Sequence, residues 1–80
     1  MQNREYTLSN GLVVKTKNAK NSWQGCNEWL HQTRRDAFWL EYYGEPALLG
    51  YAKMLDPLDA IDWINGHGYD LPEYLQKMLE

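Results

Sequence analysis

Short apolar runs separated by turn-forming residues mark the first part of the chain. Two such runs, residues 6–8 and 12–14, flank Asn10-Gly11, which is a strong signal for a tight two-residue turn. The pattern predicts a β-hairpin over residues 5–17. A two-residue loop would pair Leu8 with Val13, Tyr6 with Lys15, and Thr7 with Val14.

The segment that follows the hairpin has two interpretations. Ser22 suits the N-cap of a helix, and small or apolar residues then recur every three or four positions. These residues are Cys26, Leu30, Thr33, Ala37 and Leu40. The spacing favours a helix over residues 22–35, which would continue to Tyr43 in its longer form. The aromatic run from Phe38 to Tyr43 is typical of a strand, so a third strand over residues 37–43 remains the alternative. Gly44 would end either element.

Helix signals dominate the rest of the chain. Pro46 suits the first position of a helix over residues 46–55. Asp56 and Pro57 indicate the cap and first position of a second helix, which Gly66 would end. Asp70 is expected to cap a third. Its apolar stripe would contain Leu71, Tyr74, Leu75, Met78 and Leu79.

Together these patterns predict a single small α+β domain over residues 1–80. An N-terminal β-hairpin, or in the alternative a three-stranded antiparallel sheet, would pack on three or four short helices. Aromatic residues form 14% of the chain and would supply much of the core. One cysteine rules out an intramolecular disulfide. The polar start and the absence of a long apolar run favour a cytoplasmic protein.

Charge is distributed unevenly. Residues 1–35 carry six Lys/Arg and two acids, whereas residues 36–80 carry two Lys/Arg and nine acids. The net charge of −3 therefore combines a half of about +4 with a half of about −7. This asymmetry concerns partners and association more than fold. It predicts two surfaces of opposite sign.

Residue types that carry chemistry are sparse. Cys26, His31 and His67 could bind a metal, but a closed zinc site needs four ligands and the chain has no CxxC or HxxxH pair. No glycine-rich phosphate loop occurs either. Five residues apart on the expected helix, Cys26 and His31 would lie on different faces, so they would not form a catalytic dyad. We therefore expect no metal, no cofactor and no enzymatic activity.

The acidic C-terminal half gives the leading functional hypothesis. On the helix that begins at Pro57, two carboxylates would form a narrow stripe bordered by Leu58 and a tryptophan. Aromatic rings beside carboxylates suit a partner rich in Arg or Lys. The expected contact residues are Asp59, Asp62, Trp63, Tyr69 and Asp70. Glu41 and Glu45 would extend the surface. Capping also accounts for Asp56, Asp59, Asp70 and Glu73.

The hypothesis is therefore a small intracellular protein-binding module that inhibits or modulates a larger partner with a basic surface, for example one that binds nucleic acid. Its character resembles that of proteins that phages and mobile genetic elements direct against host machinery. One alternative is nucleic-acid binding through the basic end of the hairpin, with Lys15, Lys17, Lys20 and Trp23 as contacts. Another is a homodimer or structural subunit in which the halves of opposite charge pair.

Overall fold

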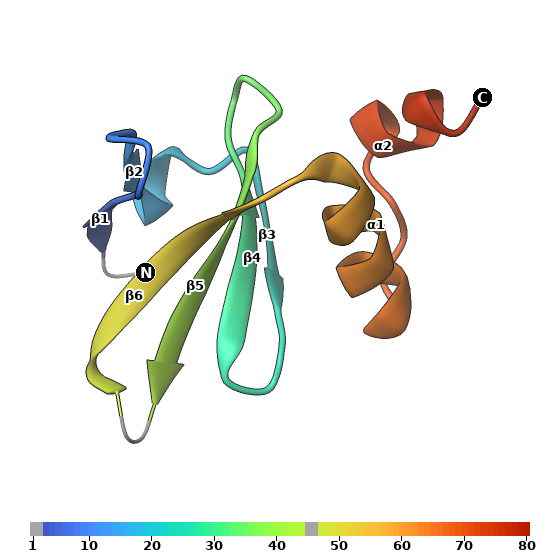
Figure 1. The fold of residues 1–80 in the computed structure, drawn as a ribbon. Helices are drawn as coiled ribbons and strands as arrows, with labels where there is room; N and C mark the ends of the chain where they lie inside the picture. Colours follow the sequence, from blue (N-terminus) through green and yellow to red (C-terminus); the bar gives the residue numbers. More distant parts are fainter. Residues whose placement is uncertain (1–2, 45–46) are drawn as a thin grey trace.

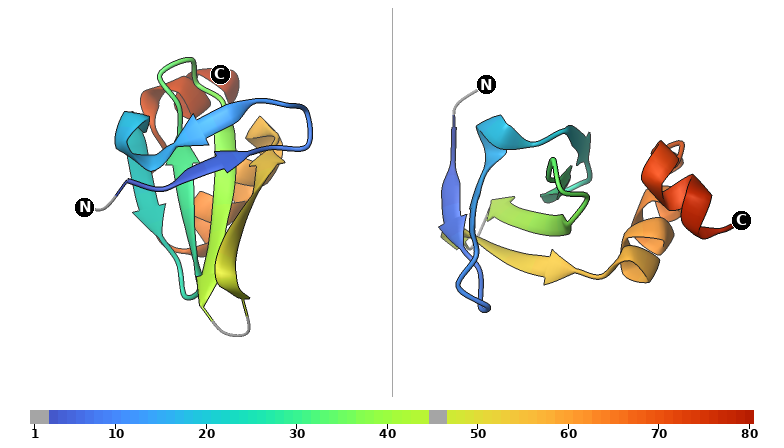
Figure 2. Two further views of the ribbon diagram at one scale, coloured as in Figure 1. Left: turned by 90° about the vertical axis from the view of Figure 1, so that its left-hand side faces the viewer. Right: turned by 90° about the horizontal axis from the view of Figure 1, so that it is seen from above.

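The computed structural model describes residues 3–44 and 47–80, which form three layers (Figure 1). A two-stranded ladder crosses one face of a four-stranded antiparallel sheet, and two helices cover the other face (Figure 2). The strands are β1 (Glu5–Thr7), β2 (Val13–Lys15), β3 (Asn21–Gln24), β4 (Glu28–Gln32), β5 (Phe38–Gly44) and β6 (Ala47–Leu55). The helices are α1 (Pro57–Gly66), α2 (Glu73–Met78) and a 3-10 turn, η1 (Thr16–Asn18). The α+β class is confirmed. The described residues contain two α-helices, not three or four.

The first hairpin forms, but its register differs by one residue from the prediction. Its strands pair Glu5 with Lys15, Tyr6 with Val14, and Thr7 with Val13. The loop has three residues: the Gly11 amide donates to the Leu8 carbonyl at 2.9 Å, and the Leu8 amide donates to Leu12 at 2.8 Å. Gly11 has a φ of +87°, as a type I turn followed by a left-handed residue requires. The added residue brings Tyr6 and Val14 to one face.

The turn between β4 and β5 has the same construction. The Thr33 amide donates to the Ala37 carbonyl at 2.8 Å, and the Asp36 amide donates to the Thr33 carbonyl at 3.0 Å. Asp36 occupies the left-handed position, with a φ of +64°. Aspartate tolerates this conformation better than most residues. The two hairpin loops are thus of one type, and their left-handed position is occupied by Gly11 in the first and by Asp36 in the second.

The predicted helix over residues 22–35 is wrong. The segment forms β3 and β4, joined by a turn in which the Gly25 amide donates to the Glu28 carbonyl at 2.7 Å. Of the residues spaced like a helical face, Leu30 lies in β4 and Leu40 in β5, and the other three lie in the turns between strands. Ser22 pairs with His31 across the ladder and caps no helix. The alternative strand over residues 37–43 is confirmed in outline by β5. It does not extend the first hairpin into a three-stranded sheet, because β5 pairs with β4 and β6 and the hairpin forms a separate ladder.

The predicted helix over residues 46–55 is also wrong, because most of that range forms β6. This strand pairs antiparallel with β5 along much of its length, from Phe38 opposite Leu55 to Gly44 opposite Ala47, across an irregularity near Tyr42. Its alanines, leucines and methionine favour helix in isolation, but pairing with a buried strand overrides that weak preference. Pro46, the expected first residue of the helix, lies outside the described residues.

The helix that begins at Pro57 is confirmed. The Asp56 carboxylate accepts from the amides of Leu58 at 2.9 Å and Asp59 at 3.5 Å, which satisfies two donors of the first turn. The final helix also exists, but it begins at Glu73 with Pro72 at its N-cap. The predicted cap at Asp70 is therefore wrong, because the chain reaches helical geometry only after Pro72.

The central sheet has two buried faces because the helices cover one and the first hairpin covers the other. Neighbouring side chains of a strand point to opposite faces, so a strand such as β5 contributes to both cores. On one face Leu30, Phe38 and Leu40 of the sheet pack against the helices. Their partners there are Ile61 and Ile64 of α1 and Leu75 of α2. On the other face Trp39 packs with Leu8 and Val14 of the first hairpin. Small two-stranded ladders are marginal alone, so this packing holds the hairpin in place.

Candidate functional site

The helical layer, which we define as residues 56–80, presents an acidic outer surface. Ala60, Ile61 and Ile64 of α1 face the sheet, while Asp59 and Asp62 are exposed. Exposed acids of this layer are Asp56, Asp59, Asp62, Asp70, Glu73 and Glu80, and its one Lys/Arg is Lys77. Lys77 is paired with Glu73 at 3.1 Å. The helices of this layer lie on the side of the sheet opposite the first hairpin (Figure 2).

Large apolar side chains lie among these carboxylates. Leu58 is 66% exposed and Leu79 is 60% exposed, although side chains of this kind usually gain by leaving water. Of the nine large hydrophobic side chains exposed among residues whose burial is described, five belong to the helical layer: Leu58, Tyr69, Tyr74, Met78 and Leu79. An apolar surface interspersed with carboxylates is suited to docking against another macromolecule.

Trp63 is half-buried, and it joins the helical layer to the sheet. Its indole Nε1 donates to Oε1 of Glu28 at 2.8 Å, and its ring packs against the core. His67 stacks on the indole at a centroid distance of 3.9 Å, and Tyr69 lies nearly parallel to it at 6.4 Å. The Trp63 ring therefore packs beneath the surface of the helical layer, and only part of the ring is exposed to solvent.

The expected contact residues differ in their surroundings: one is hydrogen-bonded to the sheet, and the others are exposed to solvent. Tyr69 is tied to β3 because its hydroxyl donates to the Gln24 carbonyl at 2.7 Å. Asp59 and Asp62 are exposed on α1, and Asp70 is exposed in the segment that leads to α2. The role of these residues in partner binding remains a prediction. Glu41 does not extend the surface, because it is fully buried, and Glu45 lies outside the described residues.

The alternative nucleic-acid residues are arranged less favourably than expected. Trp23 is half-buried against the core on the helical side of the sheet, so its ring is not free to stack on a base. Lys20 forms an ion pair with Asp36 at 3.0 Å. Lys17 is exposed and Lys15 is half-buried. The lysines thus lie at the hairpin side of the molecule, apart from the tryptophan.

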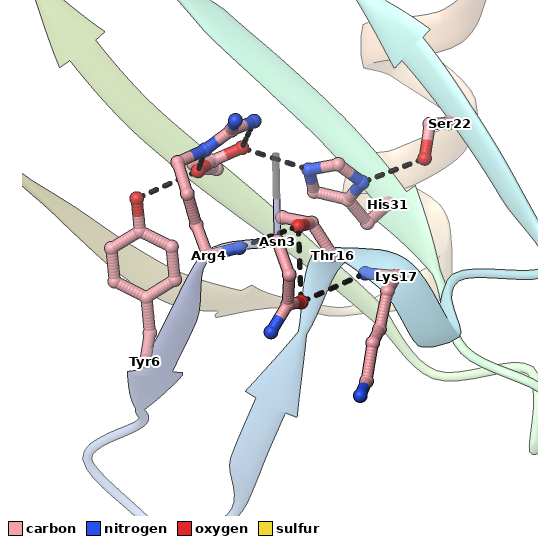
Figure 3. Close-up of polar contacts among 8 residues, drawn as sticks. Asn3, Arg4, Tyr6, Thr16, Lys17, Ser22 and His31 are labelled. Carbon is pink, nitrogen blue, oxygen red and sulfur yellow. Dashed lines mark hydrogen bonds and ion pairs between the residues drawn. The ribbon is translucent and has the colours of Figure 1, made fainter. Parts of the chain in front are cut away.

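A buried polar network, which the sequence did not reveal, lies between the first hairpin and the sheet (Figure 3). At its centre Glu41 accepts two hydrogen bonds from the Arg4 guanidinium, one from Tyr6 at 2.6 Å and one from His31 at 3.0 Å. Ser22 completes the chain at 2.7 Å from Nδ1 of His31. The network thus links β1, β3, β4 and β5.

Burial and hydrogen bonding pull the ionisation of these groups in opposite directions. Burial alone would raise the pKa of Glu41, but hydrogen bonds from Arg4, Tyr6 and His31 lower it to about 2. Burial lowers the pKa of His31 below its usual value, against the opposing effect of Glu41. Burial, and then the bond to Glu41, raises the pKa of Tyr6 to about 12. At neutral pH Glu41 is therefore ionised and His31 is neutral.

This protonation state assigns the hydrogen bonds. Neutral His31 donates from Nε2 to Glu41, and its Nδ1 accepts from the Ser22 hydroxyl. Ser22, His31 and Glu41 follow the order of nucleophile, base and acid found in hydrolases. Here Arg4 already neutralises the carboxylate, and the lowered pKa makes His31 a weak base. The arrangement stabilises the fold more readily than it activates Ser22.

Only strand assignment could have revealed this network in the sequence. Glu41 and Trp29 are Cα partners, as are His31 and Trp39, so the two polar residues lie on neighbouring strands and share a face. Residue parity would show this once residues 28–32 and 38–44 are recognised as antiparallel strands. Arg4 comes from 37 positions away, and no local signal points to it.

The described residues contain no group of three or more His, Cys, Asp or Glu arranged to hold a metal ion. Cys26 is exposed in the β3–β4 turn. Among the described residues, no helix combines the length and the apolar character that crossing a bilayer demands. No protein-family model, curated protein sequence or solved structure matches the chain.

Proposed function

We propose that the protein is a non-enzymatic binding module that docks its helical layer on a basic surface of a larger protein. The observation that carries this proposal is the mixture of exposed Leu58 and Leu79 with the carboxylates of Asp59 and Asp62. The apolar side chains would supply affinity by leaving water. The carboxylates would steer the approach and set orientation.

Trp63 supports the same surface in this proposal. By stacking with His67 and lying parallel to Tyr69, it holds the end of α1 and the following segment against the sheet. A rigid surface loses less conformational entropy on binding than a flexible one. Where the partner's basic surface serves nucleic acid, the docked carboxylates would occupy phosphate positions and block that use. Inhibition or modulation follows from such occupancy.

Charge neutralisation on the exposed helix face tests the proposal. The partner is first captured from a lysate of the native host, identified by mass spectrometry and purified. Its affinity is then measured for the wild type and for Asp59→Asn combined with Asp62→Asn. The matched control is Glu5→Lys, which changes the net charge by the same amount on the hairpin side. Both target side chains are exposed, so neither variant should disturb the fold.

We expect the double variant to bind about tenfold more weakly, with a smaller dependence on salt, and the control to bind as the wild type does. Leu58→Ser should weaken binding as well, with little change in salt dependence. Equal affinities of wild type and double variant would refute the proposed surface. So would equal losses in the double variant and in Glu5→Lys, because general charge would then explain the effect.

Nucleic-acid binding remains the alternative proposal for the hairpin side, with Lys15, Lys17 and Lys20 as its residues and without Trp23, which packs on the helical side of the sheet. Its support is the exposed positive charge there, to which Arg34 and Arg35 add. Fluorescence titration with single-stranded and duplex oligonucleotides at low salt tests it. Absence of salt-sensitive binding would remove this alternative.

Self-association is the other alternative. The edge position of β6 supports it, since an edge strand offers unpaired backbone groups and β6 also exposes Tyr51 and Met54. Sedimentation at low and high salt distinguishes pairing of charged halves from pairing of strand edges, because only the former is abolished by salt. A monomer under both conditions would exclude both arrangements.

A further inference from the structure

A groove of about 500 Å³ lies on the side of the molecule opposite the helical layer, between β2 and the β4–β5 turn. This volume falls within the range of small-molecule sites, roughly 300–1,000 Å³. Val14 and Trp39 line the groove and are 5% and 1% exposed, so they form an apolar floor. Leu12 and Val13 line it as well and are 43% and 49% exposed.

Three cations border this apolar surface: Lys15, Arg34 and Arg35. None of them forms an ion pair with a described residue. Asp36, the acid of the same turn, is engaged by Lys20 at 3.0 Å and by Gln32 at 2.9 Å. Glu5 is the Cα partner of Lys15 across the ladder, without an ion pair between them. The groove therefore keeps an excess of positive charge beside an apolar floor.

The turn that carries the two arginines is well defined. Thr33 Oγ1 accepts from the amides of Arg35 at 3.3 Å and Ala37 at 3.1 Å, in addition to the two backbone bonds that close the hairpin. The contacts of Asp36 fix the left-handed position of the turn against β4, through Gln32, and against the segment just before β3, through Lys20. Arg34 and Arg35 thus project from a braced tip, and little backbone ordering would be needed to bind a ligand there.

We infer that this groove binds a small, freely diffusing amphipathic anion: an apolar body that bears one carboxylate, sulfonate or phosphate group. The apolar body would contact the apolar lining of the groove, in which Leu12 and Val13 are the most exposed apolar side chains. The anionic group would reach the guanidinium groups, which can bind such oxygens in pairs. An uncharged apolar molecule would leave the cations unused, and a simple inorganic anion would leave the floor uncovered. This inference is independent of the function proposed for the helical layer.

Anilinonaphthalene sulfonate, an apolar body with one sulfonate, is a suitable probe. Its fluorescence titration against the folded protein should give one saturable site. N-phenylnaphthylamine, the corresponding uncharged molecule, should bind more weakly by a factor of about ten or more. Amide shifts in two-dimensional NMR should concentrate at Val13, Val14 and Ala37. Near-ultraviolet circular dichroism, unchanged by the dye, shows that the native state is the one that binds.

The decisive variant is Arg34→Gln combined with Arg35→Gln. Both side chains are exposed, so the fold should survive. We expect it to weaken binding of the sulfonate probe about tenfold, which corresponds to about 1.4 kcal/mol. The control, Lys53→Gln combined with Lys77→Gln, removes the same charge from residues that do not line the groove, and it should bind as the wild type does.

Four results would overturn the inference. The first is equal affinity for the charged and uncharged probes. The second is amide shifts centred on the helical layer, where Leu58 and Leu79 are exposed. The third is protein self-association that the arginine variant abolishes, because a second copy would then be the occupant. Binding to vesicles of phosphatidylcholine and phosphatidylserine, with no binding of the free probe, would assign the groove to a lipid surface and would likewise refute a diffusing ligand.

Discussion

Replacing Glu41 with glutamine should remove much of the stability that the buried polar network supplies. The carboxylate is fully buried and accepts hydrogen bonds from Arg4, Tyr6 and His31. Glutamine keeps the shape of the side chain but loses the charge. Its amide NH2 would also replace an acceptor with a donor beside three other donors. Such a mismatch in a buried site is more costly than the loss of one ordinary hydrogen bond.

The pKa of Glu41 sets the magnitude. It falls from 4.5 to about 2 in the folded protein, and each pKa unit corresponds to about 1.4 kcal/mol. The ionised carboxylate therefore contributes on the order of 3 kcal/mol to the free energy of unfolding at neutral pH. Small domains have about 5–15 kcal/mol in total, so this is a large share.

Urea unfolding at neutral pH, followed by tryptophan fluorescence, measures the effect. We expect Glu41→Gln to lower the free energy of unfolding by about 3 kcal/mol, from the shift above. Glu73→Gln is the matched control, because this carboxylate is exposed and contacts only Lys77 among the described residues. The control should change the free energy of unfolding very little.

The pH dependence gives a second measure with a defined sign. Because the folded pKa of Glu41 is below its unfolded value, its contribution is complete above pH of about 4.5 and is lost as the pH falls towards about 2. His31 adds an earlier loss that begins below pH of about 6.5, since only the unfolded chain readily binds its proton there. Glu41→Gln should remove the lower step. Wild-type stability in the variant, or an unchanged slope between pH 4.5 and 2, would refute this account. Should the variant not fold, a wild-type stability that stays constant from neutral pH down to pH 2 would refute it equally.

Three further predictions concern the stability at alkaline pH, a helix cap and the first turn. Because the pKa of Tyr6 is raised in the folded protein, the stability that this group contributes is complete below pH of about 10 and is lost as the pH rises through about 12. Tyr6→Phe should reduce this alkaline loss of stability, measured by urea unfolding at high pH. An unchanged loss would contradict the assignment. Asp56→Ala removes the acceptor for two amides and should lower the free energy of unfolding by about 1 kcal/mol in thermal or urea unfolding, whereas Asp56→Asn should retain most of it. In Gly11→Ala the new methyl group meets no atom within 4 Å, but the residue must adopt a φ of +87°, so the free energy of unfolding should fall by about 1 kcal/mol. Gly66→Ala is the control: it is equally uncrowded and not at positive φ, so it should not lower the free energy of unfolding. Equal effects of the two variants would exclude the conformational explanation.

The candidate site was accessible from the sequence only in part. The exposed carboxylates of α1 followed from a local rule, because Asp56 and Pro57 announce the helix and the apolar spacing fixes which side is buried. The half-buried position of Trp63 did not follow, since it depends on Glu28 at the start of the distant strand β4. The groove also escaped sequence analysis, because β2 and the β4–β5 turn meet only after the hairpin folds over the sheet.

The sequence by itself determined the features with short-range causes. These are the first hairpin, the helix with its Asp56 cap, the α+β class and the separation of charge between the two halves. Tertiary structure decided the rest. Residues 22–35 and most of 46–55 have weak or helix-favouring local preferences, yet they form β3, β4, their turns and β6. Pairing within the sheet, of β3 with β4 and of β4 and β6 with β5, buries apolar side chains and satisfies the backbone. The contact between Arg4 and Glu41 likewise exists only because the hairpin crosses the sheet at that place. Local preferences amount to tenths of a kcal/mol per residue, whereas burial of one large side chain contributes about 2 kcal/mol, so packing prevails where the two disagree.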